Sequence, residues 1–287
     1  MIAITGGTGF VGRCLAARLL QAGYEVRLLA RQTADIPQAT VVQADVTASP
    51  ESLADLLAGC QAVIHLVGII RERRGESFHR VHVRGTENVI RACQKAGVSR
   101  LLHMSALGVR PNARSRFHRS KWQAEELVRA SGLDATIFRP SVLFGKDSAF
   151  LAQMRSLLHG PPVIPIIGNG MSLLQPIWKE DVATCFLKAL RDDRTIGHAF
   201  DLGGPETYGF EQLLDLIAEA DGVEKPKIHL PVWLMRLAAT ALSPLSSRFP
   251  VTPDQLTMLL EDNICDITEM HKTFGVAPAS IREHLAD

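Results

Sequence analysis

The stretch Thr5-Gly6-Gly7-Thr8-Gly9-Phe10-Val11-Gly12 decides the fold of this 287-residue chain. A strand-like apolar run, Met1 to Ile4, leads into it, and a helix-like pattern, Arg13 to Ala22, follows it. Glycines at such a turn bring bare backbone N–H groups and a helix N-terminus close to a phosphate. The spacing G-x-x-G-x-x-G in this context predicts a dinucleotide-binding loop. Its members are Gly6, Gly7, Thr8, Gly9, Phe10, Val11 and Gly12.

Strand-like and helix-like segments alternate through the first half of the chain. Strands are expected at Ile2 to Thr5, Glu25 to Ala30, Thr40 to Gln43, Ala62 to Val67, Arg100 to Met104 and Ala135 to Phe138. Helices are expected at Gly9 to Ala22, Pro50 to Ala58, Phe78 to Ala96 and Phe117 to Ala130. This alternation predicts an α/β fold, a doubly wound parallel sheet of the Rossmann type with a smaller, mainly helical C-terminal lobe.

Beyond Pro140 the alternation loosens, and Gly, Pro and Asn punctuate residues 160–170. A helix is expected over Lys179 to Leu190 and a strand over His198 to Leu202. Further helices are expected at Phe210 to Ala220, Val232 to Leu242 and Pro253 to Leu260. We assign residues 1–145 plus about 171–202 to the Rossmann domain, and about 146–170 plus 203–287 to a substrate or partner lobe.

Bulk properties exclude several classes of protein. A net charge of +1 with 21% charged residues argues against nucleic-acid binding through phosphate neutralisation. The five cysteines are scattered, so neither a metal site nor disulfides are expected. The sequence has neither a secretory signal nor a run of ~18 apolar residues, so no transmembrane segment is expected. We expect a cytoplasmic protein, with peripheral contact at the inner face of a membrane left open.

Two arginines bear on the choice of cofactor. Arg31 ends the second expected strand, where an NAD pocket carries an Asp or Glu and an NADP pocket an arginine. Arg13, just past the last glycine, can reach the same 2′-phosphate from the helix side. Because we expect no carboxylate to compete at this strand end, we predict NADP(H), with NAD(H) as the alternative. The competing interpretation is that both arginines are solvated surface groups.

Residues after the next strands complete the predicted cofactor site. Asp45, followed by Val46, either accepts a hydrogen bond from the adenine amino group or is an exposed loop residue; the sequence leaves the two even. The next strand ends in Leu66, Val67 and Gly68, and the glycine permits close approach of the backbone to the ligand. Asn88 is expected to tie its helix to the neighbouring strand end.

These features together resemble the extended and atypical short-chain dehydrogenase/reductase superfamily, which includes NAD-dependent epimerases and dehydratases. The resemblance covers nearly the whole chain. Within the superfamily the chain is most similar to bacterial and plastid relatives of the nucleotide-binding accessory subunit of respiratory complex I. The superfamily resemblance lies in residues 5–12, Asp45-Val46, residues 65–68, Gly85-Thr86-x-Asn88, Met104-Ser105, Lys121 and Phe138 to Gly145. The narrower similarity lies in residues 104–108, 118–121 and 175–178.

The resemblance implies a catalytic Tyr-x-x-x-Lys pair and a preceding serine, with the tyrosine as acid/base. Here the serine is Ser105 and the lysine is Lys121, but the residue four before the lysine is Phe117. A phenyl ring has no exchangeable proton. His118 is an alternative acid/base, although we expect it to be a solvated helix residue. Lys121 is expected to hold the nicotinamide ribose.

The resemblance also assigns Pro140, Ser141 and Val142 to the segment that passes the nicotinamide. The leading hypothesis is an NADP(H)-binding protein that uses its nucleotide structurally or as a redox sensor, in respiratory-complex or quinone-related work. The alternative is an active NAD(P)H-dependent oxidoreductase or epimerase-like enzyme with a non-standard proton donor.

The apolar segment from Pro231 to Leu242 has two interpretations. We expect a buried helix. The alternative is a contact surface for a quinone, an isoprenoid or a membrane. The predicted partners are therefore a dinucleotide, and either an apolar small molecule such as a quinone or a respiratory-complex protein.

Overall fold

The computed structural model describes all residues except 33, 35, 242–251 and 286–287. The chain forms two compact units. Unit 1 comprises Met1–Pro140, Lys179–Leu202 and Thr268–Val276, and unit 2 comprises Ser141–Trp178, Gly203–Ile267 and Ala277–Asp287.

These two units differ from the predicted domains in three segments of the chain. Residues 141–145 and 171–178 group with unit 2, and a short helix near the C-terminus, α10 (Thr268–Phe274), groups with unit 1. The helix α10 does so because it packs on α6 (Lys179–Ala189) and on β11 (Ala199–Leu202).

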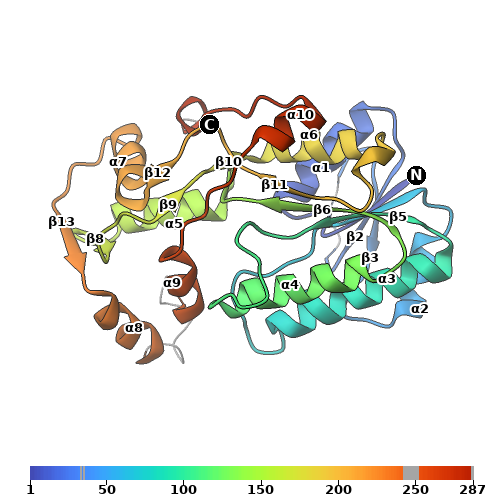
Figure 1. Ribbon diagram of the computed structural model, residues 1–287, viewed down its shortest axis with the longest axis horizontal. Coiled ribbons are helices and arrows are strands. Elements are labelled where there is room, and N and C mark those ends of the chain that lie inside the picture. Colours follow the sequence, from blue (N-terminus) through green and yellow to red (C-terminus); the bar gives the residue numbers. More distant parts are fainter. Residues whose placement is uncertain (33, 35, 242–251, 286–287) are drawn as a thin grey trace. The chain divides into compact units, whose positions relative to one another are not determined.

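Unit 1 contains a seven-stranded sheet in the order β11-β6-β5-β4-β1-β2-β3, and all its strand pairs are parallel (Figure 1). The strands other than β11 are β1 (Ile2–Thr5), β2 (Val26–Ala30), β3 (Thr40–Gln43), β4 (Ala62–His65), β5 (Arg100–Met104) and β6 (Asp134–Pro140). The predicted parallel sheet is confirmed. Chain order reverses between β1 and β4, and open α/β sheets bind ligands at the carboxyl ends of strands beside such a reversal.

Helices cover both faces of this sheet. Figure 1 shows α1 (Phe10–Gln21) and α6 on one face, and α2 (Pro50–Leu57), α3 (Gly85–Ala96) and α4 (Arg116–Arg129) on the other. The helix α1 packs on α6, and α2 on α3. The predicted helix over 78–96 has two parts, because the π-helix His79–Arg84 precedes α3.

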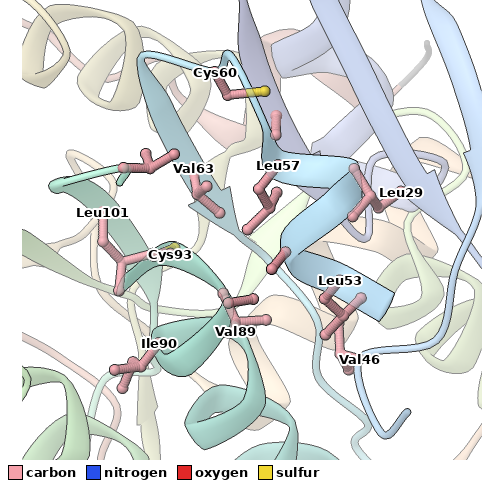
Figure 2. Close-up of a cluster of buried hydrophobic side chains, with 14 of the residues drawn as sticks. Leu29, Val46, Leu53, Leu57, Cys60, Val63, Val89, Ile90, Cys93 and Leu101 are labelled. Carbon is pink, nitrogen blue, oxygen red and sulfur yellow. The ribbon is translucent and has the colours of Figure 1, made fainter. Parts of the chain in front are cut away.

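The core under α2 and α3 follows from sequence periodicity. Side chains two apart on a strand share a face, and those three or four apart on a helix do so too. Val63 and Leu101 of the sheet thus meet Leu53 and Leu57 of α2 and Val89 of α3, all buried (Figure 2). Each such side chain stabilises the fold by roughly 1.5–3 kcal/mol. Two cysteines, Cys60 and Cys93, are part of this apolar cluster.

Unit 2 has a separate core that includes Phe144, Phe210 and Leu213. Among its described residues, the helices of seven or more residues are α5 (Ala149–His159), α7 (Phe210–Ala220), α8 (Val232–Ala241) and α9 (Pro253–Leu259). The strand β8 (Ile164–Ile167) pairs in parallel with β13 (Lys227–Leu230). Short two-residue strands form the pairs β7 (Leu143–Phe144) with β10 (Ile177–Trp178), and β9 (Leu173–Leu174) with β12 (Tyr208–Gly209). Residues 160–170, expected to be irregular, thus contain a strand.

The interpretation of residues 231–242 as a buried helix is wrong for the residues described, which end at Ala241. In α8, Trp233 is 67% exposed and Leu237 is 61% exposed. Met235 packs against a small cluster of Ile167 and Leu256, which leaves the opposite side of the helix at the surface. Within the described residues no helix combines the length and the apolar character needed to cross a membrane.

Candidate dinucleotide site

The glycine loop between β1 and α1 is built from close backbone contacts. Gly6 has φ +75°, a conformation that glycine adopts without strain, and its carbonyl accepts the Gly9 N–H at 3.0 Å. A Cβ at Gly12 would lie 2.4 Å from the Gly6 carbonyl oxygen and 2.7 Å from the Gly7 Cα. A Cβ at Gly7 would lie 2.6 Å from the Leu28 side chain. These positions tolerate little besides glycine, so the loop stays close to the sheet and the helix.

The N-terminus of α1 is suited to an anion. Among the described residues no side chain caps it, and its first turn carries no acidic residue. Its first N–H groups are therefore available to a pyrophosphate, and the helix dipole favours the negative charge. Arg13 extends from this first turn, and its Nε donates to the Thr8 carbonyl at 2.9 Å. The guanidinium is thus held against the loop in which the sequence predicts the phosphates.

The loop after β3 contains Asp45 and Val46. One carboxylate oxygen of Asp45 accepts the Thr47 N–H at 2.8 Å, so this side chain stabilises a turn. Val46 is buried. The Asn88 amide donates to the carbonyls of Val46 and Ala48, at 3.0 and 2.8 Å. The predicted tie from α3 to the neighbouring strand end is confirmed, and the contact of Asp45 with adenine stays a prediction.

Arg31 lies just past β2, and its guanidinium forms an ion pair with Glu76. The expectation that no carboxylate competes at this strand end is therefore wrong. Glu76 belongs to the loop after β4, 45 residues further along the chain. Sequence reasoning missed it because the dinucleotide motif looks for a carboxylate only at a fixed distance after the glycines.

Gly68, after β4, lies beside Lys121 of α4. A Cβ at Gly68 would lie 3.0 Å from the Lys121 Nζ, while Leu66 is buried and Val67 partly buried. The Lys121 Nζ donates to the Met104 carbonyl at 3.0 Å, and Met104 directly precedes Ser105. Residues predicted from three separate segments thus meet at the ends of β4 and β5.

Burial dominates the electrostatics of this cluster. Lys121 is 3% exposed, and loss of hydration lowers its pKa to about 8 despite the opposing charge of Glu125. The Ser105 hydroxyl is also buried, and no described residue hydrogen-bonds to it. Because buried hydroxyls are nearly always hydrogen-bonded, this group is suited to a ligand at the same place.

Phe117, four residues before Lys121, is surrounded by rings. Its ring centroid lies 5.9 Å from that of Phe78, 5.4 Å from that of His82 and 5.4 Å from that of His118. Edge-to-face contacts of this kind hold an aromatic ring in place. The ring of Phe117 is thereby held by its neighbours, about one helical turn before the lysine on α4.

The hydrogen bonds of His82 define its protonation. Its Nε2 accepts the Ile69 N–H at 3.0 Å, so the proton is on Nδ1, which contacts the Ser120 Oγ at 2.8 Å. Ser120 in turn donates to the Phe117 carbonyl at 2.8 Å. Burial and the nearby Lys121 charge lower the pKa of His82 to about 2. His82 is therefore neutral near pH 7. The sequence motifs did not point to this residue.

The expectation that His118 is a solvated helix residue is wrong. It is 5% exposed, and its backbone N–H donates to the capping Ser115 Oγ at 3.0 Å. A Cβ at Gly108 would lie 3.3 Å from the His118 ring, so the ring packs on the loop after β5.

Two further histidines are buried side by side under this site. The His65 and His103 rings lie 5.3 Å apart, and Thr5 and Thr86 contact the two ring nitrogens of His65 at 2.6 and 3.1 Å. Neither ring nitrogen of His103 has a hydrogen-bond partner among the described residues. Burial lowers the pKa of His65 to about 3 and that of His103 well below 6.5.

The predicted nicotinamide segment is divided between the units. Pro140 ends β6 in unit 1, and its carbonyl accepts the Leu107 N–H at 2.9 Å. Ser141 and Val142 belong to unit 2, where the Ser141 Oγ donates to the Asn263 Oδ1 at 2.8 Å. Their contact with a nicotinamide stays a prediction.

A family model described as the NAD dependent epimerase/dehydratase family matches residues 2–203, which include the glycine loop, Ser105 and Lys121. The chain belongs to this family. The predicted superfamily and Rossmann fold are therefore confirmed, and the family is described as NAD dependent.

Relatives of this family member include subunits of a respiratory complex. The mitochondrial NADH dehydrogenase [ubiquinone] 1 alpha subcomplex subunit 9 of Arabidopsis thaliana is 29% identical over 75% of this chain and 56% of its own length. The mitochondrial NADH-ubiquinone oxidoreductase 40 kDa subunit of Neurospora crassa is 25% identical over 97% of this chain and 76% of its own. The chain thus spans little more than half of the Arabidopsis protein. The ceramide reductase of Caulobacter vibrioides is 33% identical over 64% of this chain and 58% of its own.

Solved structures agree on the fold. The crystal structure of gox2253 is 25% identical, with a TM-score of 0.78 over 100% of this chain and 96% of that chain. MoeE5 in complex with UDP-glucuronic acid and NAD is 21% identical, with a TM-score of 0.76 over 99% of this chain and 96% of that chain. At this identity the second likeness concerns the fold alone.

Proposed function

We propose that this protein binds NADP(H) in unit 1 and uses the nucleotide structurally or as a redox sensor. When bound, the coenzyme supplies a hydride donor or acceptor. The residues of unit 1 that would hold it are the glycine loop, Arg13, Arg31, Asp45, Val46, Leu66, Val67, Gly68, Lys121 and Pro140. The uncapped N-terminus of α1 and the tight Gly6, Gly7 and Gly12 contacts support this fit.

The observation that carries the proposal is the ring at position 117. The superfamily resemblance assigns a proton-donating tyrosine to this position, and Phe117 has no such proton. The neighbouring His82 does not replace the missing acid at neutral pH. The pKa of His82 is lowered to about 2, and its Nε2 already accepts the Ile69 N–H. Binding without efficient proton transfer is what these residues favour.

The preference for NADP(H) rests on two guanidinium groups. Arg31 lies at the end of β2, and Arg13 extends from the first turn of α1. An arginine at the end of this strand suits a 2′-phosphate through paired hydrogen bonds. A pocket without these charges, which distinguished NADP(H) from NAD(H) by shape alone, would show a weaker preference.

Two classes of partner fit the protein. The likeness to respiratory-complex subunits supports assembly with another protein of that kind, peripheral to a membrane. The exposed Trp233, Leu234 and Leu237 of α8 support contact with an apolar molecule such as a quinone. Purification of the protein from membranes, with and without NADPH, separates these two classes by showing whether a protein or a quinone accompanies it.

The proposal is tested by combining binding with turnover. When the purified protein is denatured, the absorbance and mass of the released nucleotide should identify it as NADP(H). Titration with NADPH should saturate, while a panel of quinones, ketones and sugar nucleotides should give no oxidation of NADPH at ordinary enzymatic rates. Phe117→Tyr, which restores a phenol beside Lys121, should gain activity on any substrate that binds. Rapid turnover by the unmodified protein would contradict the proposal.

A second candidate function is an active NAD(P)H-dependent oxidoreductase. The buried Ser105 hydroxyl, which lacks a hydrogen-bond partner among the described residues, and Lys121, whose pKa is about 8, favour it. In this scheme the Ser105 hydroxyl passes a proton to the substrate and takes one back from water. Ser105→Ala should then lower turnover at least 100-fold, since general acid catalysis contributes about 10²–10⁴-fold. Unchanged turnover in this variant would remove Ser105 from the scheme.

A further inference from the structure

The ion pair between Arg31 and Glu76 joins two loops of unit 1 at the end of β2. Its partners are unequally exposed, with 63% of the Arg31 side chain accessible and 27% of the Glu76 side chain. Arg31 is the residue that the proposed function assigns to the 2′-phosphate. The Glu76 carboxylate is therefore paired with the guanidinium that would bind the 2′-phosphate.

Glu76 is held in place by its own loop and not only by this pair. Arg73 and Glu76 exchange both backbone hydrogen bonds, at 3.0 and 2.9 Å, and so close a tight turn over Arg74 and Gly75. Gly75 has φ +82°, which suits such a turn. We refer to residues 73–76 as the Glu76 hairpin.

Arg80 fastens the Glu76 hairpin to the neighbouring loop after β3. Its guanidinium donates to the Gly75 carbonyl at 2.8 Å and to the Thr47 hydroxyl at 3.2 Å. The preceding Glu72 accepts the Phe78 N–H at 2.8 Å and pairs with Arg116 at 2.9 Å. The hairpin is thus supported from two sides, and the Glu76 carboxylate would remain near Arg31 if their pair were broken.

We propose that Glu76 sets the coenzyme choice of this site. With NAD(H) the carboxylate accepts a hydrogen bond from the adenosine ribose 2′-hydroxyl, and with NADP(H) the 2′-phosphate displaces it from Arg31. This inference rests on the proposed function. A carboxylate at the end of this strand is the group that selects NAD, and here a distant loop supplies it instead of the strand itself. The site therefore carries both determinants, and its preference for NADP(H) is weaker than Arg31 alone would give.

The physical reason is competition for one cation. A phosphate dianion and a carboxylate repel each other and seek the same N–H donors, so binding of NADP(H) includes the cost of breaking the Arg31 pair. That cost is modest because exposed ion pairs contribute little. The effect of Glu76 on NAD(H) binding has the opposite sign, because the carboxylate accepts a hydrogen bond from the 2′-hydroxyl and so strengthens binding.

The test compares coenzyme affinities of the full chain by fluorescence titration with NADPH and with NADH at fixed ionic strength. Glu76→Gln keeps the size and removes the charge. It should tighten NADPH about 3- to 10-fold and weaken NADH by a similar factor. Glu87→Gln is the matched control, because it breaks another exposed ion pair of unit 1, with Arg91, without touching Arg31 or the Glu76 hairpin, and it should move each affinity less than about twofold. Equal shifts in the two variants, or no shift in Glu76→Gln, would overturn the inference.

Arg31→Ala separates this inference from the proposed function. It should weaken NADPH about 10- to 100-fold and leave NADH within about threefold. If Arg31→Ala behaves so while Glu76→Gln changes nothing, only the role of Glu76 fails. If Arg31→Ala leaves NADPH unaffected, or if the unmodified chain binds neither coenzyme, the proposed NADP(H) site itself fails and the role of Glu76 fails with it.

Discussion

Two regions at the carboxyl edge of the unit 1 sheet differ in how they are built. The glycine loop after β1 is made of backbone groups and leaves the N–H groups of α1 available. The cluster around Lys121 is made of side chains, the buried Ser105 and His82 and the half-buried Phe117. The first region depends on the absence of side chains, and the second on their chemistry.

The difference teaches which property a substitution can remove. A glycine loop loses its close backbone contacts when a Cβ enters it, and its glycines support the proposed phosphate site. A proton relay fails when one residue changes, while the surrounding packing survives. Phe117 fits that second case, because its ring contacts Phe78, His82 and His118.

The largest effect should come from Gly12→Ala in the glycine loop. Its Cβ would lie 2.4 Å from the Gly6 carbonyl oxygen, and rigid backbone cannot move aside cheaply. We expect nucleotide binding to be lost and the free energy of unfolding to fall by about 1–3 kcal/mol. Thermal unfolding and coenzyme titration measure both. Gly9→Ala is the matched control, because its Cβ would lie 3.2 Å from the same oxygen and should cost less. Equal effects of the two variants would contradict the close-packing account.

Much of this architecture could be predicted from the sequence, because it depends on local patterns. The period-two and period-3.6 alternation gave the six strands of the first half and their helices, and the glycine spacing placed the loop. The pairing of β8 with β13 was not predicted, because its partners are about 60 residues apart. The helix α5 was also missed, although Ser148 caps it and its buried Leu151, Met154 and Leu158 follow helical spacing.

Within the candidate site the same limit applies. Ser105 and Lys121 could be recognised from a motif, and the structure brings Lys121 to the carbonyl before Ser105. Glu76 could not, because only folding brings it to Arg31. His118 was expected at the surface, since the sequence gives no angle for a helix side chain until the packing partner Gly108 is known.

A pH series on Lys121 sharpens the contrast on the side of the buried cluster. Its folded pKa of about 8 lies below the unfolded value of 10.5, so folding favours the neutral amine. Stability should therefore rise as the pH increases from 8 to 10.5, by about 3 kcal/mol in total. Lys121→Met should lack this rise and weaken coenzyme binding. Urea unfolding at several pH values, taken as the difference between the two proteins, measures it. A rise of equal size in Lys121→Met would assign it to other groups.

The buried histidines should affect the stability of the fold at acidic pH, below the range in which Lys121 does. The pKa of His103 in the fold lies below 6.5, so its stabilising effect is complete above pH 6.5 and is lost as the pH falls below it. His103→Leu breaks no hydrogen bond formed by the ring with the described residues. It should leave stability at pH 7.5 nearly unchanged and reduce the loss toward pH 5.5 by up to about 1.4 kcal/mol per pH unit. An equally steep loss toward pH 5.5 in His103→Leu would refute the assignment to His103.

The smallest effect should come from Arg13→Ala, at the boundary of the glycine loop. The Arg13 side chain is exposed and donates to the Thr8 carbonyl, which is itself at the surface of the loop. Stability should change by less than about 0.5 kcal/mol, as is usual for exposed positions. The affinity for NADPH should fall about threefold and that for NADH should not, and the difference should shrink in high salt, because exposed charges are screened. An equal loss for both coenzymes would mean that Arg13 serves the pyrophosphate shared by the two. The 2′-phosphate would then depend on Arg31 alone.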